Sequence, residues 1–138
     1  MKLLSFLNVS NISNLEADSG YIFQKLLINS LLENNRDLEV YFIGPEKAPL
    51  INNSVVKLPL HDNYLNKYSV RFNFPWNDLM KFSQILGNID VALINQPELV
   101  SNFRSLFTVL GNNRVKIISY FHYIPIEDLP KDGKISYT

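Results

Sequence analysis

Polar side chains stand at the ends of two apolar runs that we interpret as buried strands. They are Asn95, Gln96 and Glu98 after the run 89–94, and His122 and Tyr123 after the run 115–121. Ligands bind at the carboxyl ends of strands in an open α/β sheet, so these residues are candidates for a site. An imidazole can bind a hydroxyl group or transfer a proton near neutral pH, which makes His122 the strongest catalytic candidate. The alternative for His122 is a hydrogen bond to a neighbouring loop.

The other candidates also have structural alternatives. Glu98 either binds a ligand or only favours the positive end of a helix that begins at Pro97. Gln96 either contacts a ligand or is the N-cap of that helix, although glutamine is a poor N-cap. Gly20 either lets a ligand approach free backbone N–H groups or serves a turn.

The hydrophobic pattern predicts strands that alternate with helices. We expect strands at 2–9, 38–43, 55–58, 89–94 and 115–121, and helices at 21–33, at 74–86 and from Pro97 to a stop at Gly111. Gly44 and Pro45 are expected to close the second strand. The apolar face of the first helix is expected to be Ile22, Phe23, Leu26, Leu27, Leu31 and Leu32. Apolar strands alternating with helices predict an open, mainly parallel, Rossmann-like α/β sheet with helices on both faces.

Length and composition limit the function classes. The 138 residues are predicted to form a single domain at 1–130 and a polar tail at 131–138. Thirteen basic residues balance thirteen acidic ones, so no basic field favours nucleic acid. The absence of cysteine excludes disulfides and suits a cytoplasmic protein. No segment approaches the roughly 20 apolar residues of a membrane span. The apolar stretch within residues 1–7 is shorter than the core of a signal peptide, so these residues are expected to form a strand.

The sequence lacks the common catalytic motifs. Its five glycines stand alone, so there is no Gly-rich phosphate loop, and there is no Gly-x-Ser-x-Gly elbow. His61 and His122 are too few for a metal site, and we predict neither a metal nor a cofactor. The aromatic residues Tyr64, Tyr68, Phe72, Phe74 and Trp76 form either a platform for a ligand or the packing of a long loop.

Three segments together resemble glycosyltransferases of the GT-B fold. Asp18-Ser19-Gly20-Tyr21 resembles the glycine-containing loop after their first strand, although many relatives have two glycines there. The segments 90–107 and 115–125 resemble the last part of their N-terminal domain, where a strand ends in a histidine that borders the cleft. The resemblance covers most of the chain in the order of its elements.

The resemblance implies the acceptor-binding half of an enzyme that moves a sugar from a nucleotide-sugar donor to an acceptor, in a retaining family. It implies that His122 contacts the transferred sugar. The groove would be lined by Ser10, Gly20, Tyr21, Asn95, Gln96, Glu98 and Tyr123. Donor binding would need a C-terminal domain that these residues do not contain, or a partner chain, so the isolated chain is predicted to be inactive.

Two other classes stay open at the level of sequence. One is a non-catalytic α/β binding or assembly module, whose interface would be the aromatic residues between 64 and 76. The other is a flavodoxin-like binder, for which Ser10 to Ser13 is a weak counterpart of a hydroxyl-rich phosphate loop.

Overall fold

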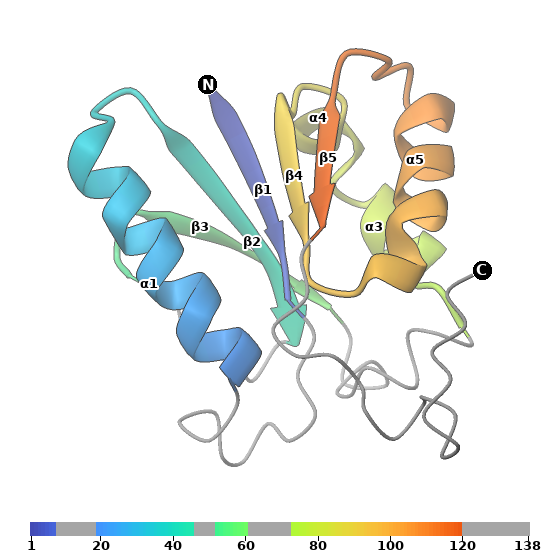
Figure 1. Ribbon diagram of the computed structural model, residues 1–138. Helices are drawn as coiled ribbons and strands as arrows, with labels where there is room; N and C mark the ends of the chain where they lie inside the picture. Colours follow the sequence, from blue (N-terminus) through green and yellow to red (C-terminus); the bar gives the residue numbers. More distant parts are fainter. Residues whose placement is uncertain (8–18, 46–51, 61–72, 120–138) are drawn as a thin grey trace, which may run out of the picture.

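A five-stranded parallel sheet forms the centre of the molecule (Figure 1). The computed structural model describes residues 1–7, 19–45, 52–60 and 73–119. Across the sheet the strand order is β3-β2-β1-β4-β5. The strands are β1 (Lys2–Phe6), β2 (Glu39–Pro45), β3 (Val55–Leu60), β4 (Val91–Ile94) and β5 (Lys116–Ser119). The predicted Rossmann-like α/β class is confirmed.

The strand order reverses between β1 and β4. The chain builds β1, β2 and β3 outward in one direction, and then returns to place β4 on the free side of β1. Leu3 therefore has Val40 of β2 as its partner on one side and Val91 of β4 on the other. Sheets of this order bind ligands where the direction reverses, at the carboxyl ends of the strands.

One face of the sheet is covered by the helix α1 (Ser19–Asn34). Its apolar layer contains Leu3, Leu7, Tyr21, Ile28, Leu38, Val40, Phe42, Val55 and Leu93. The face of α1 that packs here carries Tyr21, Gln24 and Ile28. Ile22, Phe23 and Leu26, which the sequence predicted to be buried, are 37%, 44% and 65% exposed. The predicted apolar face of this helix is therefore wrong in its first half.

The opposite face carries α3 (Trp76–Met80), α4 (Ser83–Leu86) and α5 (Val100–Val109). Phe103 of α5 is at the centre of this layer and is fully buried. Its ring lies 4.9 Å from the ring of Phe6 and 5.1 Å from that of Phe74, centroid to centroid. Aromatic pairs at such distances add to the free energy of burial. Helices on both faces agree with the prediction.

Residues 74–86 form two short helices and not the single one predicted. Phe82, between α3 and α4, has backbone angles of φ −105° and ψ 23° and leaves the helical conformation. The N–H of Phe82 donates to the carbonyl of Leu79 at 3.0 Å, a bond over three residues that tightens the end of α3. The break at Phe82 therefore separates α3 from α4.

Gly44 and Pro45 were predicted to close β2. They belong to this strand instead. Gly44 is paired with Pro59 and Pro45 with Leu60 on β3. Pro59 is tolerated because β3 is an edge strand of the sheet that the structure describes. A Cβ on Gly44 would lie 2.8 Å from the buried Phe42 ring and 3.2 Å from the carbonyl oxygen of Leu7, so glycine is needed for this close approach.

The helix α5 ends as predicted at Gly111, which has a φ of 75°. The N–H of Gly111 donates to the carbonyl of Thr108 at 3.0 Å, and that of Asn112 to the carbonyl of Phe107 at 2.8 Å. This is the Schellman arrangement, in which a left-handed residue satisfies the last carbonyls of a helix. The chain then turns directly into β5.

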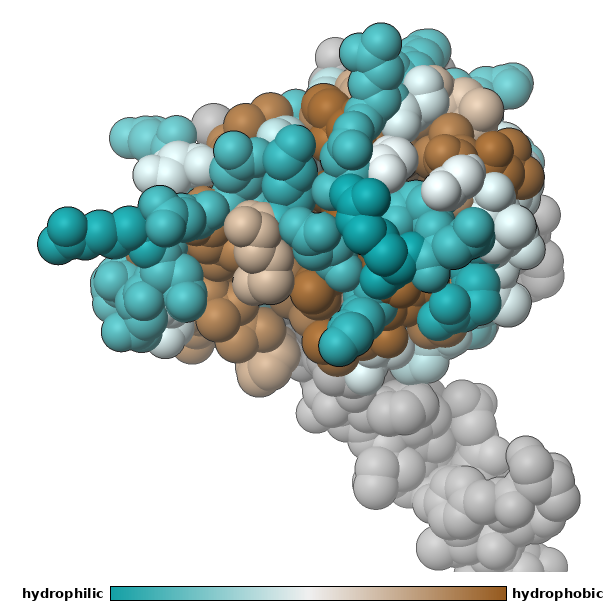
Figure 2. All heavy atoms as spheres, turned by 90° about the horizontal axis from the view of Figure 1, so that it is seen from above, coloured by the Kyte–Doolittle hydropathy of each residue, from teal (hydrophilic) through white to brown (hydrophobic). Residues whose placement is uncertain are grey.

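The amino ends of the strands meet at a face of the molecule that is largely hydrophilic (Figure 2). Asp90 joins two strands here, since its carboxylate accepts a hydrogen bond from the backbone N–H of Lys2 at 2.8 Å. Arg114 lies on the other side, with its Nε 3.4 Å from the carboxylate. The Lys2 N–H and, to a smaller extent, Arg114 lower the pKa of Asp90 against the opposing effect of desolvation.

We expect Asp90→Asn to reduce stability at neutral pH and to lose this effect in acid. A carboxyl group whose pKa is lowered by folding stabilises the protein above its unfolded pKa, and this contribution disappears as pH falls through the folded value. Urea unfolding of parent and variant between roughly pH 2 and pH 7 measures the difference, which should begin to shrink below about pH 4. Arg114→Gln is the matched control and should have the smaller effect. A difference that does not depend on pH would contradict this assignment.

Candidate functional site

The carboxyl ends of the strands point to the edge of the sheet where α1 and α5 begin (Figure 1). At this edge the N–H of Leu7 donates to the carbonyl of Ile43 at 3.0 Å, so the chain stays with β2 just after β1 ends. The N–H of Asn95 donates to the carbonyl of Phe6 at 3.3 Å, so the chain after β4 lies beside the same end of β1. The polar segment after β4 is thus held at the point where the strand order reverses.

This polar segment makes a tight turn into the next helix. Gln96 is extended, with φ −117° and ψ 101°, the conformation favoured before a proline. The N–H of Leu99 donates to the carbonyl of Gln96 at 2.9 Å and closes the 3₁₀ helix η3 (Pro97–Leu99), from which α5 continues. Pro97 stands in the first turn of η3, and α5 begins three residues later than the helix predicted from Pro97.

Gln96 is the backbone N-cap of η3, but its side chain does not cap the helix. Instead its Nε2 donates to Oε1 of Glu98 at 3.3 Å. Gln96 is only 4% exposed, whereas Glu98 is exposed. The buried amide of Gln96 therefore orients the exposed carboxylate of Glu98. Both residues, with the half-buried Asn95, lie at the edge of the sheet formed by the carboxyl ends of the strands (the carboxyl edge).

Gly20 and Tyr21 open the helix α1 at the same edge of the sheet. Gly20 is buried. The ring of Tyr21 is 3% exposed and belongs to the apolar layer with Leu7 and Leu93. The ammonium group of Lys25 lies 5.9 Å from the centre of this ring, within range of a cation–π interaction. Tyr21 thus contributes to the docking of α1 on the sheet.

Three predicted site residues, Ser10, His122 and Tyr123, lie outside the described residues. The other five, Gly20, Tyr21, Asn95, Gln96 and Glu98, are all found at the carboxyl edge of the sheet. They belong to two segments, the start of α1 and the turn after β4. These are the segments that follow the two strands between which the strand order reverses.

Ser119 is a polar residue of this edge that the sequence did not single out. It is the last residue of β5 and the register partner of Ile94, and its hydroxyl donates to the carbonyl of Ile94 at 2.7 Å. The side chain is half-buried. Ser119 lies inside the strand predicted at 115–121, and so it was not selected as a residue at a strand end.

The aromatic residues between 64 and 76 are only partly described. Phe74 is buried between α3 and α5 and makes an edge-on contact with the Phe103 ring. Trp76 packs edge-on against Phe74, with centroids 5.0 Å apart, and is 38% exposed. Phe74 thus packs in the core, which was the alternative to a platform for a ligand. Tyr64, Tyr68 and Phe72 lie outside the described residues.

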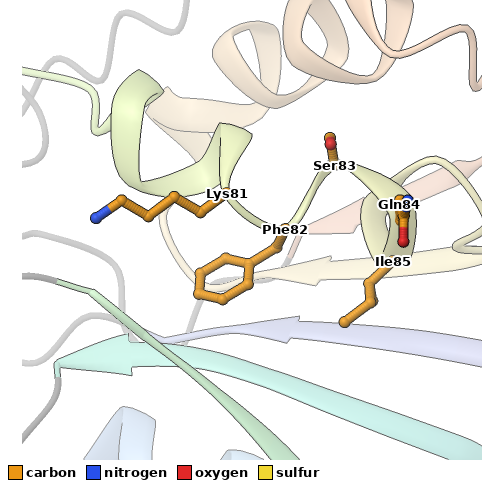
Figure 3. Close-up of a pocket in the computed structure, with 5 residues that line it drawn as sticks. All are labelled: Lys81, Phe82, Ser83, Gln84 and Ile85. Atoms are coloured by element: carbon orange, nitrogen blue, oxygen red, sulfur yellow. The ribbon is translucent and has the colours of Figure 1, made fainter.

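A surface depression of about 280 Å³ lies elsewhere, at the break between α3 and α4 (Figure 3). It is lined by Lys81, Phe82, Ser83, Gln84 and Ile85. Phe82 and Ile85 point toward the sheet, whereas Lys81 extends away from them. Only one continuous segment lines this depression, and none of the predicted site residues takes part.

Among residues 1–7, 19–45, 52–60 and 73–119, the His, Asp and Glu side chains form no group of three that could hold a metal ion. No helix in these ranges is both long and apolar enough to cross a membrane.

Comparison with known proteins gives no relative. No protein-family model, no curated protein and no solved structure matches this chain.

Proposed function

We propose that this chain is the acceptor-binding half of a glycosyltransferase that moves a sugar from a nucleotide-sugar donor to an acceptor. The observation that carries the proposal is the polar turn after β4, in which the buried Gln96 orients the Glu98 carboxylate 3.3 Å away at the reversal point of a parallel sheet. Carboxylate and amide groups bind sugar hydroxyls well, because each hydroxyl both donates and accepts a hydrogen bond.

The roles of the residues follow from their chemistry. Glu98 accepts a hydrogen bond from an acceptor hydroxyl, and Asn95 can donate and accept in the same groove. Gly20, at the start of α1, has no side chain and so lets a ligand approach the backbone at the same edge of the sheet. His122 is the proposed catalytic residue, on the resemblance given above. The donor is bound by a further domain or by a partner chain, so this chain alone transfers no sugar.

We expect Glu98→Gln to weaken the binding of saccharides to this chain about tenfold or more. A hydrogen bond to a charged group contributes about 1.5–3 kcal/mol, which corresponds to roughly 10- to 150-fold in affinity. The experiment titrates the chain with a panel of monosaccharides and disaccharides and follows the backbone amide signals by NMR. Signals of Asn95, Gln96 and Gly20 should shift together.

The matched control is Glu33→Gln, which changes an exposed carboxylate at the far end of α1. It should leave saccharide binding unchanged. Shifts confined to residues 81–85 would refute the proposed site. Turnover of a nucleotide sugar by the chain alone would refute the division into two halves.

A further inference from the structure

A serine hydroxyl joins the carboxyl ends of β4 and β5. Ser119, the last residue of β5, donates from its hydroxyl to the carbonyl of Ile94, the last residue of β4, at 2.7 Å. A carbonyl oxygen can only accept, so the single hydroxyl proton of Ser119 is committed to this bond. The hydroxyl oxygen keeps its capacity to accept a hydrogen bond, and the residue is half-buried, so a ligand at this edge can reach it.

Ser119 lies on the same face of the sheet as the turn that carries Glu98. Side chains alternate along a strand, so Ser119 shares its face with Ile117, which packs against the apolar layer under α5. Ile94 and Leu99, at the two ends of the turn, belong to this same layer. Because neighbouring strands are about 4.7–4.9 Å apart, Ser119 lies one strand spacing from the point where the turn begins.

Both Ser119 and Glu98 accept hydrogen bonds from a ligand. An ionised glutamate has no proton to donate, and the Glu98 carboxylate is oriented by the Gln96 amide. The hydroxyl of Ser119 donates to Ile94 and therefore not to a ligand. A ligand held by both groups must supply two donors, as neighbouring hydroxyl groups or an amino group of a sugar do. A carboxylate or phosphate on the ligand would be repelled by Glu98 and would find no donor at Ser119.

We propose that Ser119 is a further ligand-binding residue, and that with Glu98 it selects neutral and amino sugars against acidic and phosphorylated ones. Ser119 accepts a hydrogen bond from one sugar hydroxyl, and its bond to Ile94 holds the hydroxyl in this accepting orientation. The inference rests on the function proposed above and specifies the class of acceptor that the same site takes.

The test compares Ser119→Thr with Ser119→Val, because these two side chains have the same shape and differ only in the hydroxyl group. The probes are glucose, galactose and mannose, each with its monodeoxy derivatives, and binding is followed by the amide signals of Asn95 and Gln96. The Thr variant should keep the parent affinity within about twofold, and the Val variant should lose about three- to tenfold, as expected for one neutral hydrogen bond.

The monodeoxy sugars separate a direct contact from a structural role. Removal of one particular hydroxyl should weaken binding to the parent by the same factor as Ser119→Val, and should not weaken binding to the Val variant further. A structural role would weaken every probe equally, and this result would overturn the inference, as would equal affinities of the Thr and Val variants. Ser119→Ala replaces Ser119→Val if circular dichroism shows that the Val variant does not fold.

A second measurement tests the preference for donors. The amino and uronic acid derivatives of the sugar that binds are titrated at neutral pH, and the amino sugar should bind at least about tenfold more tightly. Glu98→Gln should reduce this ratio several-fold, because it removes the negative charge. Equal binding of the two derivatives by the parent would overturn the selectivity. If no sugar binds, the function proposed above fails, whereas binding that does not depend on Ser119 overturns only this inference.

Discussion

Phe103→Ala is expected to lower the free energy of unfolding by about 3–5 kcal/mol, the usual loss when a fully buried phenylalanine is truncated. Phe103 has no exposed surface, and its ring contacts those of Phe6, Phe74 and Phe107. These partners come from β1, from the segment before α3 and from α5 itself. The cavity would therefore open where three separate elements meet, and they cannot all move inward to fill it.

Urea unfolding measures this loss as a lower midpoint at an unchanged slope. Stabilities of single domains are about 5–15 kcal/mol, so the variant is expected to be marginal. Ser105→Ala, on the exposed side of the same helix, is the control and should change stability by less than about 0.5 kcal/mol. A loss below about 1 kcal/mol for Phe103→Ala would mean that the aromatic cluster does not hold α5 on the sheet.

The segment around α5 could be predicted from sequence because its signals are local. Pro97 begins η3, Gly111 ends α5 with a positive φ, and the apolar spacing between them places Phe103 and Phe107 in the core. Each of these features depends on residues within one or two turns of one another. The parallel α/β class followed in the same way from apolar strands that alternate with helices.

The burial of the first two turns of α1 could not be predicted, because these turns pack on a strand that is distant in the sequence. Ser5 of β1 and Gln24 of α1, which share a hydrogen bond, are 19 positions apart in the chain, and neither residue alone indicates that both are buried. Of the predicted apolar face, Ile22, Phe23 and Leu26 are exposed, whereas Leu27, Leu31 and Leu32 are partly buried against the sheet. Where apolar residues surround a helix, periodicity no longer specifies which side is buried.

The candidate site was predictable in position but not in its internal contacts. The rule that ligands bind at the carboxyl ends of strands led to Asn95, Gln96 and Glu98, and the structure brings these residues to one turn. That Gln96 is buried and donates to Glu98 depends on the φ and ψ angles of this turn, which the sequence does not specify. Ser119 was missed because it lies within the segment predicted as the strand 115–121.

Asn112→Asp is expected to lower the free energy of unfolding by about 3–5 kcal/mol at neutral pH, as for other buried charges without a partner. Asn112 is 2% exposed, and its Nδ2 donates to the carbonyls of Leu86 at 3.0 Å and Ile89 at 2.9 Å. Its Oδ1 accepts from the N–H of Val115 at 3.2 Å. The amide thus joins α4, the approach to β4 and the approach to β5. Aspartate would replace the donor by an oxygen that faces two carbonyl oxygens.

The deficit of this variant should shrink as pH falls, as that of Asp90→Asn does, although folding shifts the pKa values of the two carboxyl groups in opposite directions. Burial beside two carbonyl oxygens would raise the pKa of the new carboxyl group above its unfolded value of about 3.9. A group whose pKa is raised by folding destabilises the protein progressively as pH rises above the unfolded value, so the deficit should be smallest below about pH 4. Urea unfolding at several pH values measures this. Asn113→Asp, at an exposed neighbouring position, is the control and should stay within about 0.5 kcal/mol of the parent. An equally small effect of Asn112→Asp at neutral pH would show that the amide can be replaced, and that backbone pairing alone holds the three segments together.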